Sequence, residues 1–168
     1  MTSYWHQSLA LFIVLVMTRL QAAEPWILRE DGIGPIKVGI TLAQLNTTLH
    51  EKLAKSQDDD QGCFYVTSKK HPHVSFMLLD GRLARIDVDD VGVANSAGVR
   101  VGDSEAHVVK VYGSSLKVGP HHYIEDGRYL TIRSSDGRYG TRFETEQGKI
   151  TTFYSGTFKA IQFVEGCS

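Results

Sequence analysis

Seven histidines are the residues of this chain best suited to metal binding or proton transfer. Two of them flank a proline in His71-Pro72-His73, and such a pair can place both rings on one ion. Carboxylates for the same site could come from Asp58, Asp59 and Asp60, or from Asp87, Asp89 and Asp90. The chain lacks a His-Glu-x-x-His motif, a dense Cys/His spacing and an Asp-x-Asp-x-Asp-Gly calcium loop. We therefore expect no metal site and no cofactor.

Catalysis by acid–base or nucleophilic groups has little support in the sequence. His121-His122-Tyr123 follows a glycine–proline bend, and only one of two adjacent strand histidines can face a given sheet surface. Glu144, Glu165 and Asp87 could form the carboxylate pair of a glycoside hydrolase, but sequence does not give their separation. No serine lies in a Gly-x-Ser-x-Gly elbow, and no glycine-rich phosphate loop is present. We expect a protein without enzymatic activity, with a hydrolase as the open alternative.

The two cysteines, Cys63 and Cys167, are the only ones in the chain. An even number in an exported protein favours a disulfide. The bridge would close a loop of about 105 residues, which the chain-entropy model values at 4–5 kcal/mol. The alternative is a reactive thiol, but there is no Cys-x-x-Cys motif and neither cysteine opens an obvious helix.

Export is predicted by the N-terminal segment. The apolar run from Leu9 to Met17 has the length of a signal-peptide core and is too short to span a bilayer. Small residues at Ala22 and Ala23 place cleavage before Glu24, so residues 1–23 would be the signal peptide. An uncleaved anchor is the alternative, because the first eight residues carry no Lys or Arg and Arg19 lies near the cleavage point.

The remaining segment, residues 24–168, has the length of one domain with its own core. It carries 17 Lys and Arg against 19 Asp and Glu once Arg19 is removed. Without a basic block it lacks the field that attracts nucleic acid or anionic membranes, and no further run is long enough to insert into a membrane. We expect a bacterial periplasmic or secreted protein with no nucleic-acid partner.

A four-residue phrase occurs twice, as Val38-Gly39-Ile40-Thr41 and Val101-Gly102-Asp103-Ser104. The glycine permits a sharp turn, and the hydroxyl residue is a good helix N-cap. The first copy precedes an apolar stripe at Leu42, Leu45, Leu49 and Leu53, and Gln44 completes a capping box. The repeat predicts two related units, residues 24–90 and 99–168, that each begin a helix at this phrase.

Several antiparallel strands follow each expected helix, joined by turns such as Asp80-Gly81 and Gln147-Gly148. The expected strands are 63–68, 74–79 and 83–88 in the first unit, and 116–124, 128–133, 139–145 and 149–155 in the second. The predicted fold class is α+β, in which the two units share a meandering antiparallel sheet with both helices on one face.

The other face of that sheet would then be open for recognition. Strand alternation places Tyr129 and Arg133 on one side, and aromatic and charged side chains of this kind suit contact with a partner. Ordinary solvated strand residues are the alternative, because Tyr and Thr are good strand formers. The candidate binding residues are His121, Tyr123, Tyr129, Arg133, Tyr139 and Tyr154.

The segments from Gly32 to Ala43, from Val101 to Gly113 and from Val164 to Cys167 resemble a family of small exported bacterial proteins. The paired Gly-x-Thr/Ser helix starts are also similar to the β-lactamase inhibitory protein fold and to some periplasmic immunity proteins. In this chain Ile40 and Asp103 stand where the immunity proteins have Met. The resemblance implies a protein-binding sheet in the cell envelope and carries over no catalytic residue.

These observations predict an exported protein-binding module, inhibitor-like or immunity-like, that docks a protein partner in the envelope through its open sheet face. Two alternatives remain open. One is a small-ligand or carbohydrate receptor that uses Tyr123, Tyr129, Tyr139 and Tyr154 as a stacking platform. The other is a structural or stress-related role in the envelope.

Overall fold

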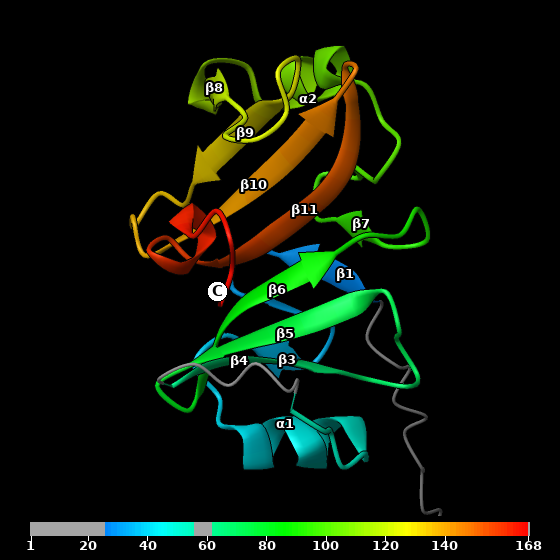
Figure 1. The fold of residues 1–168 in the computed structure, drawn as a ribbon, viewed down its shortest axis with the longest axis vertical. Helices are drawn as coiled ribbons and strands as arrows, with labels where there is room; N and C mark the ends of the chain where they lie inside the picture. The colour runs from blue at the N-terminus through cyan, green and yellow to red at the C-terminus, as the bar shows by residue number, and fades with distance from the viewer. Residues whose placement is uncertain (1–25, 56–61, 168) are drawn as a thin grey trace, which may run out of the picture.

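A seven-stranded antiparallel sheet and a small mixed sheet, with two helices, make up the α+β fold of this computed structural model, which describes residues 26–55 and 62–167 (Figure 1). The expected signal peptide and the Asp58–Asp60 run lie outside these residues. The large sheet contains, in order across it, β4 (Cys63–Thr67), β5 (Val74–Leu79), β6 (Arg82–Val88), β11 (Lys149–Thr157), β10 (Tyr139–Glu146), β9 (Arg128–Arg133) and β8 (Lys117–Pro120). The two units therefore join at β6 and β11, and each contributes one meander.

The first copy of the repeated phrase turns the chain from an extended segment into α1 (Leu42–Leu49). Gly39 has a φ of +95°, which favours glycine, and its N–H donates to the carbonyl of Leu83 at 2.7 Å. The N–H of Leu83 donates back to the carbonyl of Ile40 at 2.8 Å. Thr41 then caps the helix through a complete capping box with Gln44. The phrase thus fastens the start of α1 to the beginning of β6.

The second copy repeats these contacts before α2 (Glu105–Tyr112). Gly102 has a φ of +89° and donates to the carbonyl of Ile150 at 2.8 Å, while Ile150 donates to the carbonyl of Asp103 at 2.9 Å. Ser104 caps α2 by accepting from the N–H of His107. Ile150 is the second residue of β11, as Leu83 is of β6. The predicted duplication of the helix start is confirmed, and the two copies also share a backbone hydrogen-bond pattern that the sequence did not predict.

The two caps should contribute measurably to stability. We expect Thr41→Ala and Ser104→Ala each to lower the free energy of unfolding by about 1 kcal/mol, because each leaves an amide of the first turn without its acceptor. Thr41→Ser keeps a hydroxyl at the cap and should match the parent. Urea unfolding measures all three. An equal loss for Thr41→Ser and Thr41→Ala would mean that the methyl group of Thr41, not the cap, is what matters.

The first helix ends earlier than its leucine stripe predicts. His50 adopts a left-handed conformation with a φ of 49°, so the helix stops at Leu49. Leu53 remains 6 % exposed, because the chain turns back and its N–H donates to the side-chain oxygen of Asn46. The position is apolar because it is buried, although it is not helical.

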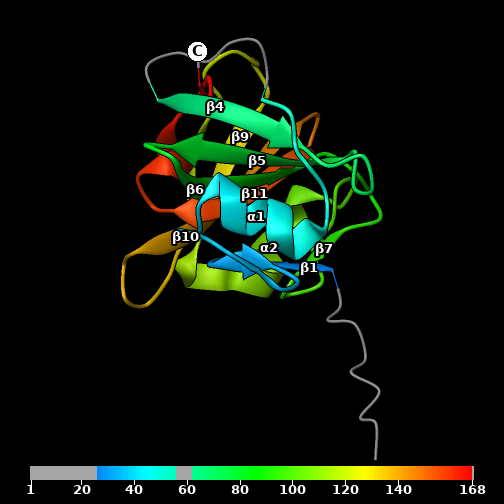
Figure 2. The ribbon, with the colours of Figure 1, turned by 90° about the horizontal axis from the view of Figure 1, so that it is seen from below.

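A second sheet, which the sequence did not predict, is formed by segments expected to be extended chain and loop. It consists of β3 (Ile36–Lys37), β2 (Gly32–Ile33), β1 (Ile27–Arg29) and β7 (Ala94–Asn95), in that order. The strands are only two or three residues long, and β1 pairs with β7 in parallel. In the view from below, this sheet and α2 lie toward one side of the molecule, β4 and β5 toward the other, and α1 between them (Figure 2).

One large hydrophobic core joins both units. Its members include Leu45 and Leu49 of α1, Val108 of α2 and Ile33 of the small sheet, together with alternate residues of the large sheet such as Phe153. The core thus contains residues of both helices, of the small sheet and of the large sheet. Two 3₁₀ turns, η1 (Gly113–Ser115) and η2 (Ala160–Gln162), complete the described elements. Within the described ranges, no helix is long and apolar enough to cross a membrane.

Candidate functional site

The outer side of the large sheet, away from the main core, carries a layer of polar and aromatic side chains. Alternation places the strand residues there: Arg85 and Asp87 alternate with the buried Ile86 and Val88, and Tyr154 follows Phe153. His121 belongs to the loop before β9 and joins them by stacking on Tyr129. We call this set the polar layer; it consists of Tyr65, Arg85, Asp87, His121, Tyr129, Arg142, Glu144 and Tyr154.

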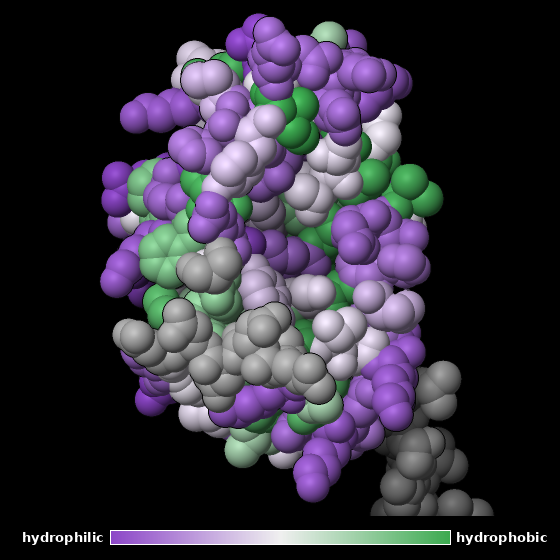
Figure 3. Space-filling view, in the orientation of Figure 1, coloured by the Kyte–Doolittle hydropathy of each residue, from purple (hydrophilic) through white to green (hydrophobic). Residues whose placement is uncertain are grey.

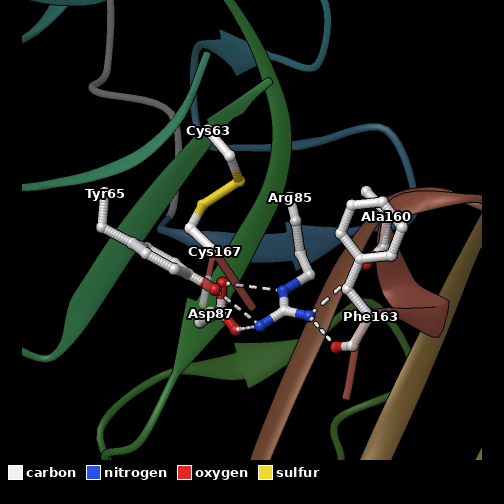
Figure 4. Close-up of a disulfide and its surroundings, with 7 residues drawn as sticks. All are labelled: Cys63, Tyr65, Arg85, Asp87, Ala160, Phe163 and Cys167. Carbon is white, nitrogen blue, oxygen red and sulfur yellow. Dashed lines mark hydrogen bonds and ion pairs between the residues drawn. A yellow bond between two sulfur atoms is a disulfide. The ribbon is translucent and has the colours of Figure 1, made fainter. Parts of the chain in front are cut away.

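Arg85 is the centre of one half of the polar layer and is 5 % exposed. Figure 4 shows its guanidinium between Asp87, Tyr65 and the carbonyl of Phe163. It contacts the Asp87 carboxylate at 2.8 and 3.2 Å and donates to the Tyr65 hydroxyl at 2.6 Å. It also lies 4.2 Å from the centre of the Tyr154 ring. Burial raises the pKa of Asp87, and the charge of Arg85 opposes that rise.

Glu144 is the centre of the other half. Its carboxylate accepts from the Tyr154 hydroxyl at 2.8 Å and from Nε2 of His121 at 3.1 Å. Burial, and after it the charge of Glu144, raises the pKa of Tyr154, so this hydroxyl keeps its proton and remains a donor.

The imidazole of His121 has no nitrogen left for chemistry. Its Nδ1 accepts from the backbone N–H groups of Tyr123 and Ile124 at 3.1 and 3.2 Å. Nε2 must therefore carry the proton that is donated to Glu144. The ring is also stacked on Tyr129, with centroids 4.5 Å apart. His121 is thus a structural support that fixes the loop before β9, rather than a base or metal ligand in this arrangement.

We expected this face of the sheet to be open for a partner. That prediction is wrong for the polar layer, because three of the candidate binding residues are buried there. Tyr129 is 9 % exposed, Tyr154 is 2 % exposed, and the side chain of His121 is 5 % exposed. The residues that follow β11 run over this side of the sheet, as the red segment in Figure 1 shows. We call residues 158–167 the C-terminal strap.

The strap is fastened at both ends and in the middle. At its start, the Phe158 ring lies 4.2 Å from the guanidinium of Arg133. In the middle, Arg142 donates to the side-chain oxygen of Gln162. At its end, Cys167 forms the predicted disulfide with Cys63 (Figure 4). The bridge joins β4 of the first unit to the last described residue of the second.

The other candidate residues are dispersed. Tyr139 pairs with Thr157 at the end of the sheet and lies on the same side as Phe143, opposite to Tyr129. It lines a separate hollow of about 410 Å³ with Glu30, Asp31 and Arg138. Four tyrosines therefore do not form one stacking platform, as the carbohydrate alternative requires.

Tyr123 and Arg133 are the candidate residues that remain accessible. Arg133 lies at the end of β9 beside Phe158 of the strap, whereas Tyr123 has 60 % of its surface exposed. Tyr123 stands at the edge of a groove of about 460 Å³, between the loop that precedes β9 and the end of the strap. Its hydroxyl bonds to the carboxylate of Glu165 across the groove, and its ring meets His122 edge-on. The lining residues are Cys63, His122, Tyr123, Phe163, Val164, Glu165, Gly166 and Cys167.

Sequence reasoning missed the strap side of this groove, although one signal pointed to it. A bridge between Cys63 and Cys167 necessarily brings Phe163 to Gly166 toward β4. Figure 3 shows the face seen in Figure 1, where hydrophobic side chains form separate patches among hydrophilic ones. Among the residues that are not grey, no broad apolar surface is visible on this face.

The histidine pair His71 and His73 does not converge on one point. His71 stacks on Trp26 with ring centroids 3.9 Å apart, whereas His73 lies 3.3 Å from Asp89 and 3.7 Å from Asp90. Among residues 26–55 and 62–167, no three His, Cys, Asp or Glu side chains are placed to hold a metal ion.

Comparison with known proteins gives a fold and no function. No family model and no curated protein matches the sequence. Among solved structures, the uncharacterized protein yfeY from Escherichia coli matches with a TM-score of 0.51 at 11 % identity. The match covers 77 % of this chain and 99 % of yfeY. At this identity the likeness concerns the fold alone.

Proposed function

We propose that this chain is an exported protein-binding module of the bacterial cell envelope, inhibitor-like or immunity-like, that docks a protein partner at the groove beside Tyr123. The observation that carries the proposal is the exposed aromatic side chain of Tyr123 at the edge of a groove, where a hydrogen bond to Glu165 fixes its orientation. Tyrosine is among the residues that contribute most to protein interfaces, because it combines apolar area with a polar tip.

The groove is also preorganised, which reduces the entropy cost of binding. One wall belongs to the strap, which the disulfide fixes to β4. The other wall is the loop that His121 ties to Glu144 and to the sheet. The groove would therefore not have to reorganise when a partner binds.

Export is supported by the bridge between Cys63 and Cys167, because such bridges persist in oxidising compartments. The expected signal peptide points to the same compartment. The proposal assigns no catalytic residue, no cofactor and no nucleic-acid partner. The carbohydrate alternative loses its main support, since it depended on tyrosines that are buried or dispersed.

The test is capture of a partner from an extract of the cell envelope, with the mature chain immobilised. We expect Tyr123→Ala to weaken binding of the captured protein by about 30-fold or more, as loss of an interface hot spot does. Tyr139→Ala removes a tyrosine outside the groove and should leave binding unchanged. Binding constants from biolayer interferometry compare the two variants. Equal binding by parent and Tyr123→Ala would exclude this groove as the docking site.

A further inference from the structure

The polar layer contacts the strap largely through the main-chain atoms of the strap. Arg85 donates to the carbonyl oxygen of Phe163 at 2.8 Å and to that of Ala160 at 3.4 Å. Asp87 fixes the guanidinium in this orientation from the opposite side. Contacts to main-chain carbonyls can be made by any peptide, so they do not depend on the sequence of the strap.

Two further contacts do depend on sequence. Arg142 donates to the side-chain amide of Gln162. Gly166, whose φ is +68°, passes so close to Tyr65 that a Cβ there would lie 2.8 Å from the Tyr65 hydroxyl. The layer therefore accommodates an amide side chain at one position and favours glycine at another, because the backbone there is left-handed and a larger residue would have to displace the Tyr65 side chain.

The strap packs outside the main core. Its buried residues are Ala160, in a small separate cluster with Met77 and Ala84, and Ile161, whose Cδ1 lies against Gly140 of β10. No strap residue belongs to the cluster that joins the helices and the two sheets. Lifting the strap would therefore leave that core intact.

We propose that the polar layer around Arg85 is a peptide-binding surface that the strap occupies as an internal ligand, and that opening the Cys63–Cys167 bridge makes it available to a segment of a partner protein. Such a segment would offer two main-chain carbonyls to Arg85, an amide side chain to Arg142 and a glycine to Tyr65. A dithiol reductant opens the bridge: its two thiols become a disulfide, and Cys63 and Cys167 become thiols.

This surface lies beneath the strap, whereas the groove lies at its edge, so the inference goes beyond the proposed function and does not require it. A failure of peptide binding would leave capture through Tyr123 unaffected. Conversely, if no partner is captured at the groove, the peptide-binding measurement still tests this inference independently.

The probe is a fluorescent synthetic peptide of residues 158–167 with Cys167→Ser, measured by anisotropy against the mature chain. We expect the bridge-free variant, which carries Cys63→Ser and Cys167→Ser, to bind it at least tenfold more tightly than the disulfide-linked chain, even though its own strap competes. The same peptide with Gly166→Val should bind at least tenfold more weakly, because its side chain meets Tyr65. Since this second change is in the probe, it does not affect folding of the protein.

A thermal melt of the bridge-free variant shows whether it is folded. If it is not, the disulfide-linked chain with Gly166→Val replaces it, because the clash with Tyr65 displaces the end of the strap while the loop stays closed. That chain should bind the unmodified peptide more tightly than the parent does. No binding by a folded open chain, or equal binding of both peptides, would overturn the inference.

Discussion

Gly156→Ala should lower the free energy of unfolding by about 3 kcal/mol or more, a large effect for one methyl group. Gly156 lies in β11 opposite Arg85 of β6, at the pair of strands where the two units join within the large sheet. A Cβ at this position would lie 2.1 Å from the carbonyl oxygen of Ala84 and 2.7 Å from the Cα of Arg85. Both atoms are backbone, so the strands must separate to admit it.

Gly119→Ala is the matched control for this prediction. Gly119 also lies in a strand of the large sheet, in β8, but a Cβ there has no atom within 4 Å. We expect a change within about 0.5 kcal/mol, since a surface substitution without a new contact is nearly neutral. Urea unfolding gives both values. If Gly156→Ala were as stable as Gly119→Ala, the close approach of β6 and β11 would not be a constraint on the fold.

The features that sequence predicted well are those that depend on neighbouring residues. The helix starts at Thr41 and Ser104 were readable because a cap needs only one hydroxyl and the amide three residues later. The hairpins were readable for the same reason: Asp80-Gly81 and Gln147-Gly148 both have positive φ at both positions, as a type I′ turn requires.

The small sheet was not predictable in this way. Its strands are too short for any alternation to be recognised, and β1 pairs with β7 in parallel across more than 60 residues of chain. Gly32 and Ile33 read as a turn region, yet their backbone groups pair with Ile36 and Lys37. The pairing of β1 with β7 depends on how the fold brings distant parts of the chain together and not on their local sequence.

The candidate site shows a similar division. Alternation correctly placed Tyr129 and Arg133 on one side of β9, because side-chain direction is a local property of a strand. What covers that side depends on where the strap folds back, and its residues have no periodicity that reveals it. The cysteine pair was the one long-range signal in the sequence. The bridge ties the end of the strap to β4, and the strap therefore covers the polar layer.

Asp87→Ala should lower the free energy of unfolding by about 3–5 kcal/mol, because it leaves the buried guanidinium of Arg85 without a counter-charge. The side chain of Arg85 is 6 % exposed and that of Asp87 is 19 % exposed, so water replaces the lost carboxylate poorly. The remaining partners of Arg85 are neutral oxygens and the Tyr154 ring. Arg85→Met combined with Asp87→Ala removes both charges and should lose less than the sum of the two single changes, by about 1–3 kcal/mol.

Asp31→Ala is the matched control, because the pair of Asp31 and Lys37 has a similar separation of 3.0 Å but side chains that are 43 % and 53 % exposed. We expect it to cost less than about 1 kcal/mol, since water solvates the lysine that remains. The double-mutant cycle, measured by urea unfolding with the bridge intact, distinguishes a buried charge pair from simple loss of packing. Strictly additive losses for Arg85→Met and Asp87→Ala would show that the two side chains stabilise the sheet independently, and that Asp87 does not hold Arg85 toward the strap.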